Sequence, residues 1–136
     1  MKCKAYKIFR ILLVLYVALV AFLCFANFKD TLPDVEKFIF GIPTDKLVHF
    51  CMFFPFAIIG YYSYDRKENN VVDSLCAVIN SCAYGCIFAG ITEIIQASLP
   101  YRSEDLGDFG ADCLAIITAS VFIFLINLII IRKKKR

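Results

Sequence analysis

The sequence lacks any polar stretch long enough to form a water-soluble domain. Charged residues account for only 20% of its 136 positions, whereas 60% are hydrophobic and the mean hydropathy is +0.71. A soluble domain of this composition would expose far too much apolar surface to water. The sequence also lacks an internal repeat, and its only biased segment is the basic tail at 132–136. These absences predict a single integral membrane domain over residues 1–136.

Three further absences narrow the class of protein. The long apolar runs show no alternation with polar residues, which disfavours membrane strands, because backbone groups in lipid must satisfy their own hydrogen bonds. The seven cysteines include no CxxC pair, since Cys82 and Cys86 are four residues apart. We therefore expect free thiols, and neither a disulfide framework nor a cysteine zinc site. No small-x-small cleavage site follows the first apolar run, which favours an uncleaved helix over a signal peptide.

Four apolar runs are present, at residues 8–26, 47–64, 74–99 and 112–131. Each is close to the roughly 20 helical residues that cross a hydrocarbon core of about 30 Å. We therefore expect an all-α integral membrane protein, built as a four-helix transmembrane bundle. Ser81, Gly85 and Ala89 are spaced by four in the third run, and such a small-residue face allows another helix to approach closely.

The basic residues are divided unequally between the two sides that these helices define. Eleven of the 15 Lys and Arg residues lie at the two termini and in the loop at 65–73, and only four lie on the other side. Because cationic loops remain in the cytoplasm, we expect both termini to be cytoplasmic. The basic tail then faces anionic membrane lipids, and no nucleic acid partner is expected.

Polar side chains gather at the outer ends of the second, third and fourth helices. Glu93 lies six residues before the end of its apolar run, about 9 Å deep at a rise of about 1.5 Å per residue. A Glu at that depth normally faces a partner or a wet cavity, so we expect it to point into the bundle and to contact Arg102 or Lys46. Isolated charges in lipid are costly, which favours one shared cluster. We expect a single outward-open pocket whose binding residues are Asp45, Lys46, His49, Glu93, Gln96, Arg102, Asp105, Asp108 and Asp112.

Most of these residues also have a simpler structural explanation. His49 would hydrogen-bond a carbonyl or a carboxylate, and Asp45 would cap the N-terminus of its helix. Asp105 and Asp108 would complement the dipole of the fourth helix. Glu93 has no such explanation, because neither capping nor snorkelling accounts for a carboxylate at its depth.

Three segments carry a family resemblance. They are DKLVHF at 45–50, GITEIIQ at 90–96 and RSEDLGDFGAD at 102–112. In this order and spacing they resemble the D-K-x-x-H-F, E-x-x-Q and R-x-x-D-x-x-D-x-x-A-N motifs of the VanZ-like family, and the similarity extends over residues 46–120. Asp112 stands where the family has Asn, and Ala115 stands where it has Gly.

The resemblance implies a small multi-pass protein of the bacterial cytoplasmic membrane whose polar residues face the extracytoplasmic side. The family is named after an accessory protein of resistance to the glycopeptide teicoplanin. It therefore implies a role in glycopeptide resistance or in homeostasis of the cell envelope.

Three kinds of function are open at this point. A binding protein would hold an envelope lipid, a cell-wall precursor or a glycopeptide-like ligand, with Lys46 and Arg102 on anionic groups and the carboxylates on hydroxyls or amines. A membrane-embedded hydrolase or transferase would act on a lipid-linked substrate of the outer leaflet, with Glu93 or His49 as general acid or base and Arg102 on developing negative charge. A structural protein would have no site of its own and would act through a partner.

No cofactor is expected, and no recognised arrangement of a nucleophile and its base is present. A divalent metal is the lower-ranked alternative. Its ligands would be one imidazole and several carboxylates, from His49, Asp105, Asp108 and Asp112.

Overall fold

Four helices make up most of the described chain. The structure is a computed structural model that describes residues 2–26, 38–39, 41–64, 70–100 and 105–134. Its helices are α1 (Lys2–Phe25), α2 (Thr44–Tyr62), α3 (Val71–Ala97) and α4 (Leu106–Lys134). A short antiparallel hairpin of β1 (Phe38–Ile39) and β2 (Ile42–Pro43) precedes α2. Gly41 in its turn has a φ of 79°, a conformation that glycine adopts without strain. The expected helical fold with four helices is confirmed.

Three of these helices are long and apolar enough to cross a membrane. They are α1 over Tyr6–Phe25, α3 and α4. The expectation of a fourth such helix was wrong for α2, because Asp45, Lys46 and His49 fall within its first two turns and lower its hydropathy. The polar residues at the start of α2 therefore account for its lower hydropathy relative to α1, α3 and α4.

Each helix begins before the apolar run from which it was predicted. α1 begins six residues before position 8, and α4 begins six residues before position 112. Asp105 precedes α4, and its Oδ1 accepts the N–H of Gly107 at 2.7 Å, as the side chain of a helix N-cap does. The helical conformation thus continues through polar residues that a hydropathy pattern excludes.

The N-terminus of α2 differs from the expectation. The N-cap position is Pro43, and no side chain caps this helix. Pro43 also pairs with Phe38 in the hairpin. This pairing fixes the backbone immediately before the first turn of α2. Asp45 therefore lies inside the first turn and does not cap the helix.

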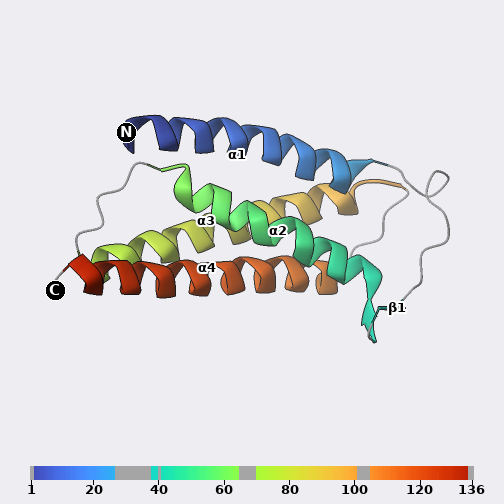
Figure 1. Ribbon diagram of the computed structural model, residues 1–136. Coiled ribbons are helices and arrows are strands. Elements are labelled where there is room, and N and C mark those ends of the chain that lie inside the picture. Colours follow the sequence, from blue (N-terminus) through green and yellow to red (C-terminus); the bar gives the residue numbers. More distant parts are fainter. Residues whose placement is uncertain (1, 27–37, 40, 65–69, 101–104, 135–136) are drawn as a thin grey trace.

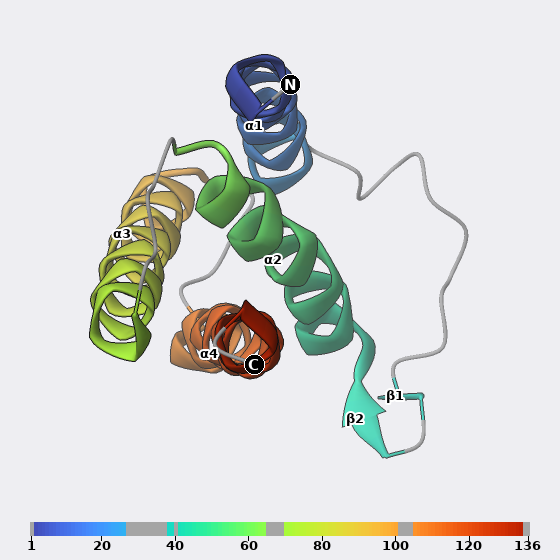
Figure 2. The same ribbon diagram turned by 60° about the vertical axis from the view of Figure 1, so that its left-hand side comes forward.

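α2 occupies the middle of the bundle, with α1, α3 and α4 around it (Figure 2). Its most extensive contacts are with α4, and α3 packs mainly on α4 as well. The fully buried core includes Phe53 of α2, Ile116 of α4 and Val20 of α1. A Cβ atom on Gly85 would lie 3.1 Å from Cγ2 of Ile116. The small residue at this position of α3 therefore permits the close approach of α4.

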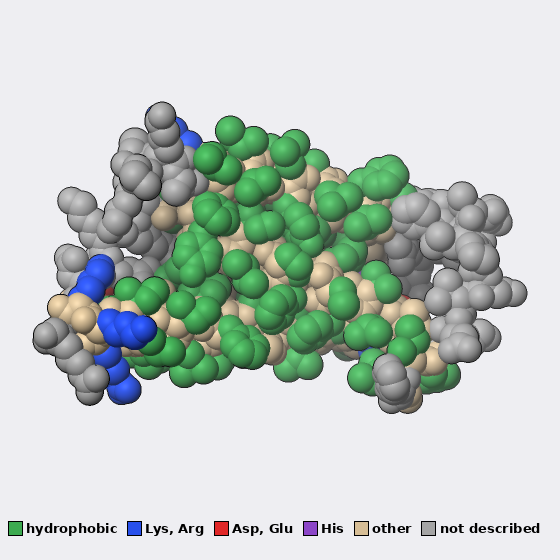
Figure 3. Space-filling view, viewed as in Figure 1, with side chains coloured by type: hydrophobic (Ala, Val, Ile, Leu, Met, Phe, Trp, Pro, Cys, Tyr) green, Lys and Arg blue, Asp and Glu red, His purple; other side chains and the backbone are tan. Residues whose placement is uncertain are grey.

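The face of the bundle seen in Figure 3 is apolar over its middle. Many large aliphatic side chains point outward, among them Val14 and Ile94. The start of α1 and the end of α4 lie together at one end of the bundle (Figure 1), and Arg132, Lys133 and Lys134 occupy the last turn of α4. An apolar belt with basic residues at one rim matches the requirements of a protein embedded in lipid.

Candidate functional site

The polar ends of three helices meet at the end of the bundle opposite the chain termini. The first turns of α2, the last turns of α3 and the start of α4 lie side by side there (Figure 1). We call the charged and imidazole side chains at this end the polar cluster, and its described members are Asp45, Lys46, His49, Glu93, Asp105, Asp108 and Asp112.

His49 lies at the centre of the polar cluster between two carboxylates of α4. Its Nδ1 is 3.0 Å from Oδ1 of Asp112, and its Nε2 is 3.7 Å from Oδ2 of Asp108. His49 is 5% exposed and Asp112 is 0% exposed. With the Asp112 carboxylate ionised, it only accepts, and Nδ1 of the imidazole donates this hydrogen bond. The packing of α2 on α4 therefore fixes the orientation of the ring.

Lys46 binds the carboxylates at the rim of the polar cluster. Its Nζ lies 2.6 Å from Oδ2 of Asp105, 3.2 Å from Oδ1 of Asp108 and 3.8 Å from Oδ2 of Asp45. The hydrogen bond from the ammonium, followed by the one from the N–H of Gly107, holds the pKa of the Asp105 carboxyl below its usual value. This ammonium is already surrounded by negative charge, so it is poorly placed to receive an anionic ligand.

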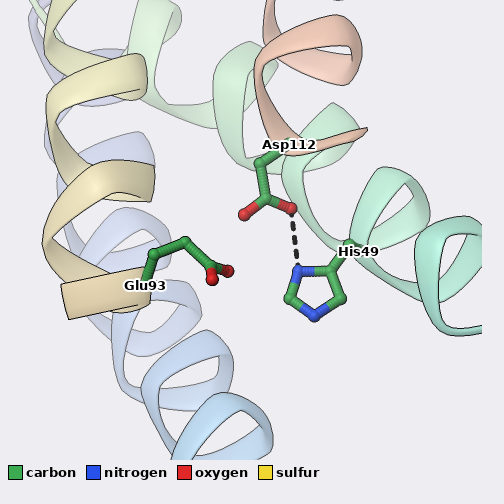
Figure 4. Close-up of side chains that lie close together, drawn as sticks. All are labelled: His49, Glu93 and Asp112. Carbon is green, nitrogen blue, oxygen red and sulfur yellow. Dashed lines mark hydrogen bonds and ion pairs between the residues drawn. The ribbon is translucent and has the colours of Figure 1, made fainter. Parts of the chain in front are cut away.

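Two carboxylate oxygens in the polar cluster have no hydrogen-bond partner within the described residues. They are Oε1 of Glu93 and Oδ2 of Asp112, and both atoms are buried. The two side chains point toward one another and toward the ring of His49 from three different helices (Figure 4). An oxygen of this kind costs free energy unless a donor or a cation reaches it.

The charge of the polar cluster is strongly negative. Its described members comprise five carboxylates against one ammonium and one imidazole. Like charges at this density repel one another in a medium of low dielectric constant. The arrangement therefore favours a bound cation, or a ligand that brings hydrogen-bond donors.

Two of the expected site residues are not in the described cluster. Gln96 is buried, and its Nε2 donates to the carbonyl oxygen of Cys24 at 2.9 Å, so it ties α3 to α1. Arg102 lies outside the described residues, and its contact with Glu93 stays a prediction. Glu93 does not contact Lys46, because Asp105 and Asp108 hold that ammonium.

A second polar network was missed by the sequence analysis. Nδ2 of Asn127 donates to the hydroxyl of Tyr61 at 2.6 Å and to Oγ of Ser74 at 3.0 Å. These residues join α4, α2 and α3, and all three are buried. The available signal was a single Asn in the otherwise apolar run of α4. The network is uncharged, and it strengthens the packing in the half of the bundle nearer the termini.

The arrangement can hold a small cation or a group rich in donors. Ligand atoms of His49, Glu93 and Asp112 all lie within 4.8 Å of one another, as do those of Asp45, Asp105 and Asp108. The second group already surrounds the ammonium of Lys46, which leaves the first as the group with unused acceptors. The chain matches no protein-family model, no curated protein and no solved structure.

Proposed function

We propose that the protein is a VanZ-like membrane protein of the bacterial cell envelope whose polar cluster binds an envelope lipid, a cell-wall precursor or a glycopeptide-like ligand. The cluster faces the extracytoplasmic side, and the role is in glycopeptide (teicoplanin) resistance or in envelope homeostasis. The observation that carries this proposal is the pair of buried carboxylate oxygens, on Glu93 and Asp112, without a partner among the described residues. The three motifs that resemble the family contain both residues.

The unused acceptors favour binding over a purely structural role. A cluster that only locks helices together is most stable when each buried polar atom has a partner. An unsatisfied buried acceptor costs about 1–3 kcal/mol, and more when it is charged. Two such oxygens at one place therefore favour a site whose ligand supplies the missing hydrogen bonds.

The orientation of the bundle follows from its charge. The end that carries the termini has Lys7 and Arg10 on α1 and three basic residues in the last turn of α4. Basic segments remain in the cytoplasm, so the polar cluster at the other end is directed to the outer leaflet. Impermeant labelling of the two ends tests this orientation.

The chemistry of the cluster favours a ligand group that donates hydrogen bonds. Lys46 is occupied by aspartates, whereas Oε1 of Glu93 and Oδ2 of Asp112 accept no hydrogen bond from the described residues. An amine or hydroxyl of a headgroup supplies the missing donors. Exposed apolar side chains adjoin the cluster in sequence, with Ile94 71% and Leu106 88% exposed, and they suit the acyl chain of the same ligand.

A membrane-embedded hydrolase or transferase is the second candidate function. The observation that favours it is His49, whose two ring nitrogens face Asp112 and Asp108. A carboxylate that orients an imidazole is the arrangement of a general base. The carboxylate of Glu93 also points toward the ring (Figure 4). Turnover of a lipid-linked substrate by the wild type and its loss in His49→Asn would select this candidate.

The binding proposal is tested with delipidated protein in vesicles that differ only in the donors of the headgroup. Phosphatidylethanolamine presents N–H donors, and phosphatidylcholine presents none. We expect the wild type to retain phosphatidylethanolamine preferentially in native mass spectra, and Glu93→Gln to lose that preference by about 10-fold. Asp73→Asn is the matched control, because Asp73 lies in the first turn of α3 at the other end of the bundle.

A resistance assay tests the cellular part of the proposal. We expect cells that depend on the protein to lose growth in teicoplanin when they carry Glu93→Gln or Arg102→Ala, while both variants accumulate in the membrane. If both variants accumulate and complement fully, the polar cluster serves packing and topology, and the binding and catalytic candidates both fail.

A further inference from the structure

The imidazole of His49 and the carboxylates of Glu93 and Asp112 form a compact group of metal-binding atoms on three helices. We propose that these three residues, which we call the triad, bind one divalent transition-metal ion of the zinc or manganese class. The inference concerns the same end of the bundle as the proposed function. It does not require the lipid or glycopeptide ligand, because it is tested with the metal alone.

The geometry of the triad is close to that of a coordination sphere. Two ligand atoms bound at about 2.0–2.2 Å, at tetrahedral or octahedral angles, lie about 2.8–3.6 Å apart. Nδ1 of His49 and Oδ1 of Asp112 are 3.0 Å apart, and the atoms of all three residues are within 4.8 Å of one another. A rotation of the long side chain of Glu93 closes the remaining gap. The ion would replace the proton that Nδ1 and Oδ1 share.

Burial provides an independent reason to place a cation here. Asp112 is fully buried, and its Oδ2 has no partner within the described residues, as is also true of Oε1 of Glu93. The carboxylate of the half-buried Glu93 faces that of the buried Asp112. When both are ionised they carry a charge of about −2, which a single divalent ion neutralises. The triad therefore has the ligand atoms and the negative charge that a cation needs, and two of its oxygens have no partner among the described residues.

Asp108 completes the arrangement as an outer partner. Metal-bound imidazoles generally direct their second ring nitrogen at a carboxylate or carbonyl, which fixes the ring orientation. Nε2 of His49 is 3.7 Å from Oδ2 of Asp108, and Oδ1 of Asp108 is 3.2 Å from Nζ of Lys46. Lys46 thus holds Asp108 beside the ring, with the carboxylate 3.7 Å from Nε2 of His49.

The donor set indicates the class of ion and its coordination. One imidazole with two carboxylates suits Zn²⁺ or Mn²⁺ better than Mg²⁺ or Ca²⁺, which prefer oxygen alone. Three protein ligands leave at least one position open for water or for an oxygen of a ligand. An ion in the triad would therefore give the proposed ligand a direct point of attachment.

Metal uptake by the purified full chain tests the inference. The protein is stripped with chelator in detergent without added lipid and dialysed against Zn²⁺ or Mn²⁺ alone, and bound metal is counted by mass spectrometry. We expect about one ion per chain in the wild type and in Asp73→Asn, and binding weaker by at least about 10-fold in Glu93→Gln and Asp112→Asn. The Co²⁺ absorption spectrum should report mixed nitrogen and oxygen ligands and should change in His49→Asn.

Equal uptake by all four proteins, or a wild type that takes up no more metal than Asp112→Asn, would overturn the inference. Circular dichroism and gel filtration confirm that each variant is folded. If Asp112→Asn does not fold, Glu93→Gln alone decides, because its side chain is only half-buried. Lipid retention in chelator separates the two proposals: retention without metal supports the proposed function even where metal uptake fails.

Discussion

Replacement of Glu93 by Gln should stabilise the metal-free protein and at the same time abolish its function. Glutamine has nearly the shape of glutamate, so the packing of α3 is preserved. The substitution removes a negative charge that lies within 4.8 Å of the ligand atoms of Asp112. At an effective dielectric constant of about 20, two unit charges at that distance repel by about 3 kcal/mol. The amide also offers donors to the unpartnered Oδ2 of Asp112.

The stabilisation is smaller than this repulsion, because part of the repulsion is already relieved in the wild type. The imidazole of His49 attracts both carboxylates, and a proton shared between the two acids would remove most of their repulsion. We therefore expect Glu93→Gln to raise the free energy of unfolding by about 1–3 kcal/mol. For a chain of this length that corresponds to a rise in Tm of about 3–10 °C.

Thermal denaturation in detergent, followed by circular dichroism in the presence of chelator, measures this effect. Asp73→Asn again serves as the control, and it should leave the Tm within about 1–2 °C of the wild type. Stabilisation combined with loss of lipid retention is the signature of a site that sacrifices stability for binding. A Glu93→Gln variant that is less stable than the wild type and still binds would refute the reasoning, because Glu93 would then be a structural partner.

Three further outcomes are expected. Asn127→Leu should lower the free energy of unfolding by about 1 kcal/mol in the same assay, since it removes two interhelical hydrogen bonds of about 0.6 kcal/mol each; an unchanged Tm would contradict it. The depressed pKa of Asp105 means that its ion pair with Lys46 stabilises the protein above the unfolded pKa of about 3.9 and is lost as the pH falls through the lower folded value. Asp105→Asn retains a capping side chain, so it should reduce the loss of Tm below about pH 4, and an acid limb that matches the wild type would argue against the pair. In intact cells an impermeant maleimide should label a cysteine placed at Phe38 and spare one at Asn70, and the reverse pattern would overturn the proposed orientation.

The helical content was predictable because it depends on composition. The apolar runs in a chain of mean hydropathy +0.71 leave the helix as the natural solution for a backbone in lipid. The bounds of the helices were less predictable. An apolar run ends where polar residues begin, whereas the helical backbone continues into those polar residues. Asp105 illustrates this point, because it caps α4 seven residues before the apolar run begins.

The sequence predicted most of the residues that lie at the site, but it did not predict which of them contact one another. That His49, Glu93 and Asp112 lie at one end of the bundle follows from the direction of each helix. Which atoms meet depends on the rotation of each helix about its axis, which the sequence pattern leaves open. Gln96 is three residues after Glu93 and is therefore turned by about 60° around α3. That rotation is enough to direct it to Cys24 of α1.

The polar start of α2 has a consequence for how the protein is made. Asp and Lys oppose entry of a helix into the bilayer by up to about 2.5–3.5 kcal/mol each near its centre and by less toward its ends. Lys46 and His49 find their partners about 60 residues later in the chain, at or just before the start of α4. These partners are Asp105, Asp108 and Asp112. We therefore expect α2 to remain beside the insertion machinery, or at the membrane surface, until α4 emerges. The polar cluster would then assemble at the same time as α2 and α4 reach their final positions. A chain that stops before α4 would lack the cluster and would be a substrate for membrane proteases.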